Sequence, residues 1–105
     1  MSMTFLASKD NAKIKHLRAL IEQNQYRKKH QQTVLEGTHL CLAWLQTHKN
    51  LVSLFTTEAA LEHPDLEKIQ EQYQGQTFII SESLYKDLST LGTSLACLAI
   101  IDIPK

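Results

Sequence analysis

The residues with the clearest capacity for chemistry in this sequence are basic, and they cluster towards its N-terminus. Residues 1–30 carry seven of the eleven lysines and arginines and only two acids, a balance of +5. Residues 31–105 carry nine acids against four lysines, a balance of −5. The formal net charge of zero is therefore the sum of a basic N-terminal part and an acidic remainder. Lysine and arginine supply the phosphate contacts behind most non-specific nucleic-acid affinity, so the pattern favours a polyanion-binding face. The alternative is a solvated helix face whose charges only maintain solubility.

Helical spacing places several polar residues on one side of a first helix expected over residues 9–24. At 100° per residue, one stripe beside the apolar one is formed by Asn11, Lys15, Arg18 and Glu22. An amide, an ammonium and a guanidinium on one face suit contacts to phosphate and sugar. The candidate RNA-binding residues are Asn11, Lys13, Lys15, Arg18, Tyr26, Arg27, Lys28 and Lys29.

Two further side chains each allow two interpretations. Tyr26 beside Arg27 could stack on an unpaired base, as aromatic and guanidinium planes do with single-stranded RNA, or it could cover the end of the first helix. Glu36 and Gly37 end the first expected strand, next to a helix N-terminus. Glu36 is expected to fix that turn, by accepting helix N–H groups or pairing with Arg27. The alternative is that Glu36 orients Arg27 or contacts a ribose hydroxyl.

The residue types that catalysis needs do not form a recognisable set. The five histidines show no metal-ligand pairing, neither cysteine belongs to a C-x-x-C, and three glycines cannot build a phosphate-binding loop. Cys41 and Cys97 could form one bridge, but buried free thiols in a reducing cytoplasm fit their apolar surroundings better. We expect no metal and no catalytic centre, and no apolar run approaches the length of a membrane helix.

The elements that must position these side chains follow from apolar periodicity and turn residues. Ser8 is expected to cap the first helix, and residues 23–32 to form a mobile or partly helical connector. Strands are expected at residues 33–36, 51–56, 76–80 and 95–103, and helical segments at 38–48, 58–62, 64–74 and 81–89. A loop is expected at residues 90–94. This order predicts one α/β domain over residues 1–105, with a small mixed or parallel sheet covered by helices on both faces.

Taken together, these segments resemble a known family. Residues 8–17 (SKDNAKIKHL), then Arg27, then residues 34–40 (VLEGTHL) are similar to the N-terminal substrate-binding domain of the SpoU/TrmH family of RNA 2′-O-ribose methyltransferases. The family pattern there is S-x-x-N-x-x-I-K-x-L, a later arginine, and a hydrophobic strand ending in E-G. The individual matches are Asn11, Lys15, Arg27, Glu36 and Gly37. Residues 31–33 and 91–95 depart from the family pattern, which often has Gly and an aromatic, or Pro and Gly, at these places.

The resemblance implies a three-layer α/β/α sandwich similar to the ribosomal proteins that bind kinked RNA, and a module that grips rRNA or tRNA. In the family, S-adenosylmethionine binding and methyl transfer belong to a knotted C-terminal domain, which this chain does not contain. We therefore expect a cytoplasmic substrate-binding module that needs no cofactor itself and is not catalytic alone. Its partners would be RNA and the missing methyltransferase domain.

The competing hypothesis is a protein-interaction module that docks to a methyltransferase domain or a partner subunit. The broadly apolar segment around Trp44 would contribute to such an interface. A mostly buried Trp44 would argue against that hypothesis, and an exposed apolar patch there would favour it. A stand-alone enzyme has little support, because the sequence shows no nucleophile, metal set or cofactor loop.

Overall fold

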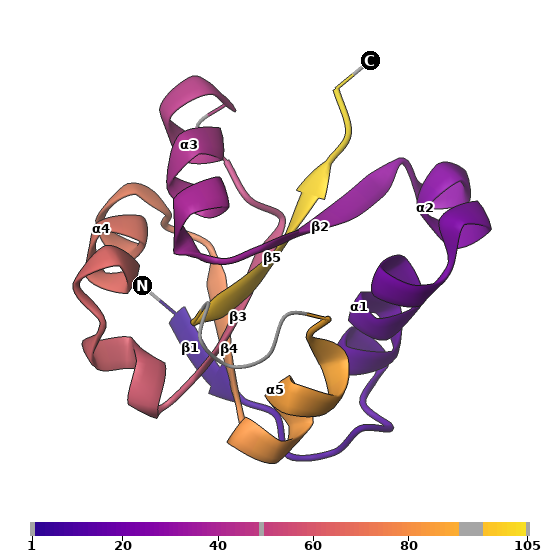
Figure 1. Cartoon of the computed structure of the whole chain (residues 1–105), viewed down its shortest axis with the longest axis horizontal. Coiled ribbons are helices and arrows are strands. Elements are labelled where there is room, and N and C mark those ends of the chain that lie inside the picture. Colours follow the sequence, from indigo (N-terminus) through magenta and orange to yellow (C-terminus); the bar gives the residue numbers. More distant parts are fainter. Residues whose placement is uncertain (1, 49, 91–95, 105) are drawn as a thin grey trace.

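The computed structural model of the chain describes residues 2–48, 50–90 and 96–104, in which strands and helices alternate around one sheet (Figure 1). The elements are, in chain order, β1 (Ser2–Phe5), α1 (Ala12–Glu22), α2 (Asn24–His30), β2 (Gln32–Glu36), α3 (Thr38–His48), β3 (Ser53–Thr57), the 3-10 turn η1 (Ala59–Glu62), α4 (Pro64–Gln72), β4 (Gln76–Ile80), α5 (Glu82–Leu88) and β5 (Cys97–Asp102). Within these residues, no helix is long and apolar enough to cross a lipid bilayer.

The strands form a mixed sheet in the order β1-β4-β3-β5-β2. β1, β4 and β3 run parallel, whereas β5 is antiparallel to both of its neighbours, β3 and β2. β3, which overlaps the strand expected at residues 51–56, is paired on both sides and all of its residues are buried, so it is a central strand of the sheet. The sheet is thus mixed, one of the two forms that the sequence allowed.

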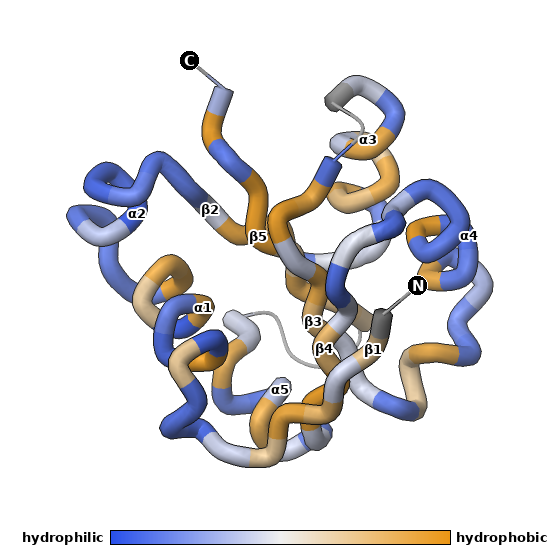
Figure 2. Tube along the Cα trace, turned by 180° about the vertical axis from the view of Figure 1, so that it is seen from behind, coloured by the Kyte–Doolittle hydropathy of each residue, from blue (hydrophilic) through white to orange (hydrophobic). Residues whose placement is uncertain are grey.

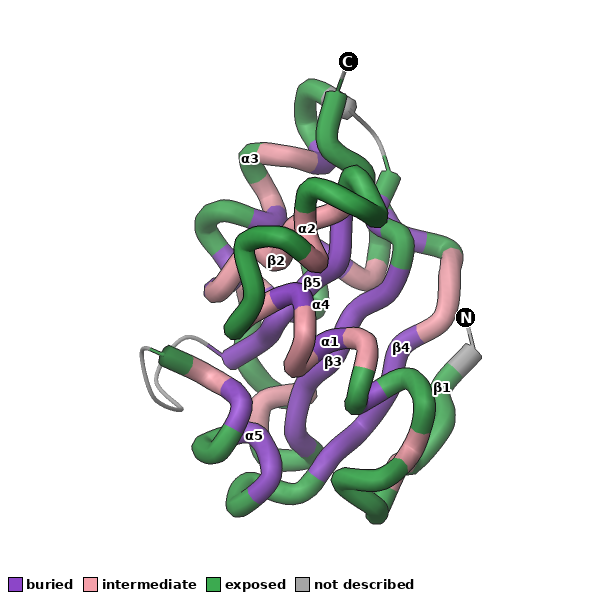
Figure 3. The backbone as a smooth tube through the Cα atoms, turned by 90° about the vertical axis from the view of Figure 1, so that its right-hand side faces the viewer, coloured by how far each residue is buried: buried purple, intermediate pink, exposed green. Residues whose placement is uncertain are grey.

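Helices cover both faces of this sheet, so the predicted α/β/α sandwich is confirmed. On β5, Leu98 and Ile100 pack with α1 and α5, whereas Cys97 and Ala99 pack with α3 and α4. This alternation follows from the two-residue period of a strand, which sends neighbouring side chains to opposite faces. The inner strands are accordingly hydrophobic in Figure 2 and buried in Figure 3, while polar residues gather on the outer helices.

The prediction that Ser8 caps the first helix is wrong, because α1 begins later. Asn11 is the N-cap residue: its backbone is extended (φ −61°, ψ 136°) and its Oδ1 accepts the Lys13 N–H at 2.8 Å. The Ser8 hydroxyl instead accepts the Asp10 N–H at 3.1 Å, in the turn that precedes the helix. Serine and asparagine both cap helices well, so residue type alone does not decide between Ser8 and Asn11.

The connector expected to be mobile or partly helical contains a regular helix, α2, which agrees with the second of these alternatives. Gln23, in an extended conformation, separates α2 from α1, and Gln31, in a left-handed one (φ 54°), ends it. Strand β1 was not predicted at all, since its four residues gain their order from pairing with β4 at the edge of the sheet. The last strand is shorter than expected; residues 91–94 of the expected loop and Leu95 lie outside the described residues.

The two cysteines meet between α3 and β5, on the α3–α4 side of the sheet. Cys41 and Cys97 are both buried free thiols, as predicted, and their Sγ atoms lie 3.8 Å apart. The hydrogen bond with Cys41, together with burial, raises the pKa of the Cys97 thiol far above its usual range. Cys97 therefore stays protonated in the folded protein at pH values where the unfolded chain ionises.

This difference predicts that the protein loses stability at alkaline pH. The contribution of Cys97 is fully present below the unfolded thiol pKa of about 8.5, and is lost as pH rises above it, by up to about 1.4 kcal/mol per pH unit. Urea denaturation between pH 7.5 and 9.5 measures this slope. The Cys97→Ala variant should be less stable throughout but show a shallower decline. Equal slopes in the two proteins would contradict the prediction.

Candidate nucleic-acid interface

Helix α1 is held against the sheet by Ile14, Leu17 and Leu20, which are fully buried. Their spacing of three residues defines one side of the helix, so the remaining positions turn towards solvent. Lys13 and Lys15 are exposed as a result, and the Lys13 Nζ lies 5.7 Å from the centroid of the Phe78 ring. The core packing of α1 therefore decides which of its basic residues can meet a ligand.

Helix α2 adds the next part of the basic surface, because it packs beside α1 and carries Lys28 and Lys29 (Figure 1). Both lysines are exposed. Among the residues that the structure describes, neither these two nor Lys13 and Lys15 form an ion pair. Four ammonium groups on two adjacent helices are thus left without a protein counterion, which is the electrostatic requirement for holding a polyanion.

A polar relay joins α1 and α2 to the end of the sheet. The His16 Nδ1 lies 2.7 Å from the Tyr26 hydroxyl and its Nε2 lies 2.7 Å from Gln32 Oε1, while Gln32 Nε2 donates to Asp102 Oδ1 at 3.0 Å. Because Asp102 fixes the orientation of the Gln32 amide, neutral His16 carries its proton on Nε2 and accepts from Tyr26 at Nδ1. No motif in the sequence marks this role of His16; only the helical spacing places it beside Lys13 and the core.

Tyr26 is half-buried in this arrangement. Its ring packs against the core under α1 and lies 4.2 Å, centroid to centroid, from the ring of His30, while His16 and His30 are 5.3 Å apart. These contacts match the interpretation in which Tyr26 covers α1. Stacking of Tyr26 on an unpaired base stays a prediction, since the three rings form one cluster whose outer member, His30, is exposed.

Arg27 is positioned as a clamp between the two helices. Its Nη1 donates to the backbone oxygens of Leu20 (2.7 Å) and Ile21 (3.0 Å), in the last turn of α1. A guanidinium at a helix C-terminus satisfies carbonyl groups that have no partner in the helix and interacts favourably with the helix dipole. Arg27 was predicted to contact phosphate, but its half-buried side chain is already engaged within the protein.

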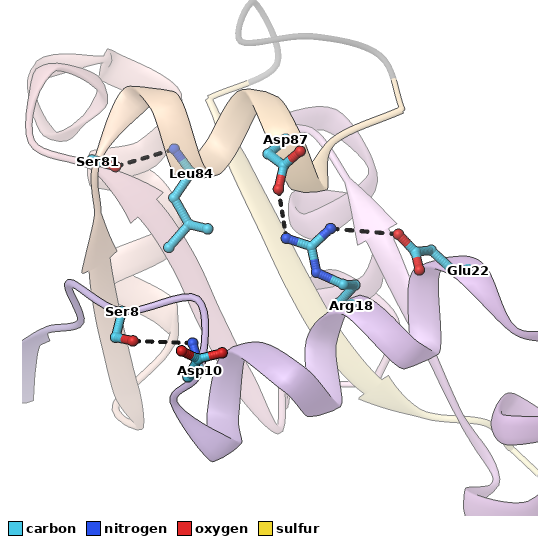
Figure 4. A network of polar contacts seen from close by, with 7 residues as sticks. All are labelled: Ser8, Asp10, Arg18, Glu22, Ser81, Leu84 and Asp87. Carbon is cyan, nitrogen blue, oxygen red and sulfur yellow. Dashed lines mark hydrogen bonds and ion pairs between the residues drawn. The ribbon is translucent and has the colours of Figure 1, made fainter.

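Arg18 and Asn11 also have partners within the chain. Arg18 forms an ion pair with Asp87 at 2.6 Å, which joins α1 to α5, and a second with Glu22 at 3.5 Å within α1 (Figure 4). The hydrogen bond with Asp87 raises the pKa of the Arg18 guanidinium above its ordinary value. Asn11 caps α1 through its Oδ1, so only its amide nitrogen remains to meet a ligand. The predicted stripe therefore contains one free cation, Lys15, among the described residues.

Glu36 contacts its own chain, but not through the groups that were expected. Its carboxylate accepts the Thr90 N–H at 2.9 Å and the Thr90 hydroxyl, so it ties the end of β2 to the end of α5. The expected pairing with Arg27 is not formed, although both residues line one small cavity of about 130 Å³. Gly37 follows with a φ of 103° that favours glycine, and its N–H donates to Cys97 O at 2.8 Å.

The described residues contain no group of three His, Cys, Asp or Glu side chains arranged to hold a metal ion. What they do contain is a three-layer α/β/α domain with an exposed basic surface on α1 and α2.

Domains of this fold form part of solved RNA methyltransferases. The chain is similar to an RNA 2′-O ribose methyltransferase at 22% identity, with a TM-score of 0.82 over 97% of this chain and 38% of that one. An rRNA methyltransferase from Sinorhizobium meliloti is 17% identical, with a TM-score of 0.78 over 99% of this chain and 38% of that one. The SpoU methyltransferase AviRb from Streptomyces viridochromogenes, in complex with AdoMet, is 11% identical, with a TM-score of 0.78 over 90% and 36%.

The sequence also matches the family model of the MRM3-like substrate binding domain over residues 11–99. The chain therefore belongs to the MRM3-like substrate binding domain family, which confirms the resemblance found on the sequence. It spans 36–38% of the length of the solved relatives named above. No protein with a curated description matches the sequence significantly.

The clamp formed by Arg27 can be tested by its effect on folding. Arg27→Ala removes a charged donor from two carbonyl groups, so we expect the free energy of unfolding to fall by about 1–3 kcal/mol. Urea denaturation followed by the fluorescence of Trp44, the single tryptophan, measures this change. Lys28→Ala, at the exposed neighbouring position, is the control and should stay within about 0.5 kcal/mol of the unmodified protein. Equal effects of the two substitutions would refute the clamp.

Proposed function

We propose that this chain is the RNA substrate-binding module of an S-adenosylmethionine-dependent RNA 2′-O-ribose methyltransferase. Ribosomal RNA is the first candidate substrate, because one solved relative is named an rRNA methyltransferase, and tRNA is the second. Residues 1–105 form the module. S-adenosylmethionine and methyl transfer are assigned to a separate knotted catalytic domain, acting in the cytoplasm, and no chemical step is assigned to this chain.

The observation that carries this proposal is the uncompensated charge on α1 and α2. Lys13, Lys15, Lys28 and Lys29 are exposed, and in the described part of the chain none of them is paired with a carboxylate. Four unpaired ammonium groups on two adjacent helices attract a phosphate backbone, which releases its own counterions when it binds them. This surface can therefore bind RNA without reading its sequence.

The structure changes the parts that the other candidate residues play. Arg27 and Arg18 hold α2 and α5 against α1 and so position the lysines, rather than contributing free charge themselves. Asn11 would donate its amide N–H groups to a sugar or base acceptor at the start of α1. Tyr26 and His30 would offer an aromatic edge between the lysines of α1 and those of α2.

Docking to a protein partner remains the second candidate function. The test set by the sequence was the burial of Trp44, and the structure gives it an intermediate exposure. The Trp44 ring packs against the core on the α3–α4 side of the sheet, and its Nε1 donates to Asn50 O at 2.7 Å. Leu40 on the same helix is 53% exposed. The evidence for protein docking is thus one exposed leucine beside a tryptophan that packs on its own domain. The four unpaired lysines are stronger evidence for RNA binding.

The role of the lysines predicts a change in the salt dependence of RNA binding. Lys28→Ala/Lys29→Ala should weaken binding to single-stranded rRNA fragments of any sequence, because two phosphate contacts are lost. The slope of log K against log salt should decrease in magnitude by about 1.4, or about 0.7 for each contact. Fluorescence anisotropy at a series of KCl concentrations measures both quantities.

A matched control separates this effect from net charge. Lys68→Ala/Lys86→Ala removes the same charge from exposed positions on α4 and α5, and should leave the slope unchanged. An identical decrease for both double variants would show that the basic surface has no special role. No measurable RNA binding by the unmodified chain at low salt would reject the proposed function of this module.

A further inference from the structure

Two grooves in the described part of the chain lie at opposite ends of the parallel strands and carry opposite charge. A groove of about 680 Å³ lies where β1, β3 and β4 end, and its charged lining residues are Glu58, Glu62 and Glu82. A second groove, of about 440 Å³, lies where β3 and β4 begin, and its basic lining residues are Lys13 and His16 from α1. A polyanion is repelled by three carboxylates, so only the second groove suits part of an RNA chain.

The second groove combines a cationic wall with a floor that is the ring of Phe78, which is 5% exposed beneath the Lys13 side chain. Below this floor, Phe78 stacks on the buried Phe55 with their ring centroids 5.1 Å apart, and Ile100 is buried beside them. The ammonium of Lys13 lies over Phe78, where the aromatic ring favours a cation. Thr4, Ser53 and Gln76 supply polar groups along the strands, and Val52 stands at the rim with 45% exposure. Its volume falls within the range of sites that take small ligands.

His16 connects this groove to the basic surface on α2. It lines the groove, is hydrogen-bonded to Tyr26, and is in ring contact with His30, the last residue of α2. Both of its ring nitrogens form hydrogen bonds, so the imidazole is held in one orientation between the groove and the lysines of α2. A strand of RNA whose phosphates lie on Lys28 and Lys29 can therefore continue past His30 and His16 to the groove.

We propose that this groove is a subsite for one unpaired nucleotide, whose base enters against the apolar floor while Lys13 contacts its phosphate. A flat base replaces the ammonium over Phe78, and the flexible lysine moves outward to the phosphate oxygen. A base held in a stacked duplex cannot reach the floor, so the subsite selects loops, bulges and single strands over continuous duplex. This inference rests on the proposed function and adds a structural preference to it.

Filling the groove tests the proposal without removing charge. Val52→Trp places an indole at the exposed rim, and Leu40→Trp is its matched control on α3, on the other face of the sheet. The probes are a single-stranded rRNA fragment and a continuous RNA duplex of the same length, compared by anisotropy. We expect Val52→Trp to weaken binding to the single strand by about tenfold and to leave duplex binding unchanged. The control should alter neither, and circular dichroism verifies that both variants fold.

The outcomes separate this proposal from the function on which it rests. If the unmodified chain binds both RNAs and Val52→Trp binds the single strand equally well, the subsite is rejected and RNA binding by the lysines stands. Equal loss for strand and duplex would also reject a nucleotide subsite. If Val52→Trp fails to fold, Lys13→Gln replaces it and should reduce the preference for the single strand more than Lys15→Gln does. If the unmodified chain binds neither RNA, the proposed function and the subsite both fail.

Discussion

The packing of α1 against the sheet is the constraint on which the remainder of this structure depends. Ile14, Leu17 and Leu20 are fully buried and share one core cluster with Phe55 and Leu98 of the sheet. Burial of three such side chains is worth several kcal/mol and permits one rotation of the helix about its axis. That rotation exposes Lys13 and Lys15 and aims His16 at Tyr26. Arg27 then holds α2 to the last turn of α1, which brings two further lysines into the same region.

Most of the sheet could be predicted from the sequence, because its inner strands are short apolar runs bounded by turn residues. β4 lies at the expected residues 76–80, α5 within the expected range 81–89, and α4 begins at Pro64, where the helical segment 64–74 was expected. β1 escaped prediction because it is ordered by its pairing with β4, about 70 residues later in the chain. The polar segment expected to be mobile or partly helical forms the regular helix α2, which Tyr26 and Arg27 attach to α1. Local propensity carries no information about such partners.

The candidate site was predicted as a set of charges, and the structure divides that set. Arg18 and Arg27 are neutralised or occupied by Asp87, Glu22 and backbone oxygens, which lie up to 69 residues away in the sequence. Sequence spacing can place a cation on a helix face but cannot show which acid the fold brings opposite it. The same limit hid the relay from Tyr26 through His16 to Asp102, since its members come from α1, α2, β2 and β5. Of the predicted cations, only the four lysines of α1 and α2 are neither paired with a carboxylate nor bound to backbone oxygens in the described part of the chain, so they can bind a ligand.

The two ends of the sheet thus differ in charge, and the central claim is that RNA meets the basic helices α1 and α2. The most direct measurement is a set of amide ¹H–¹⁵N NMR spectra of the labelled chain during titration with an rRNA fragment. The largest shifts should fall on residues 13–16 of α1 and residues 26–30 of α2, with α4 and η1 unchanged. Shifts concentrated on α3 and α4 instead, or none at saturating RNA, would contradict this assignment.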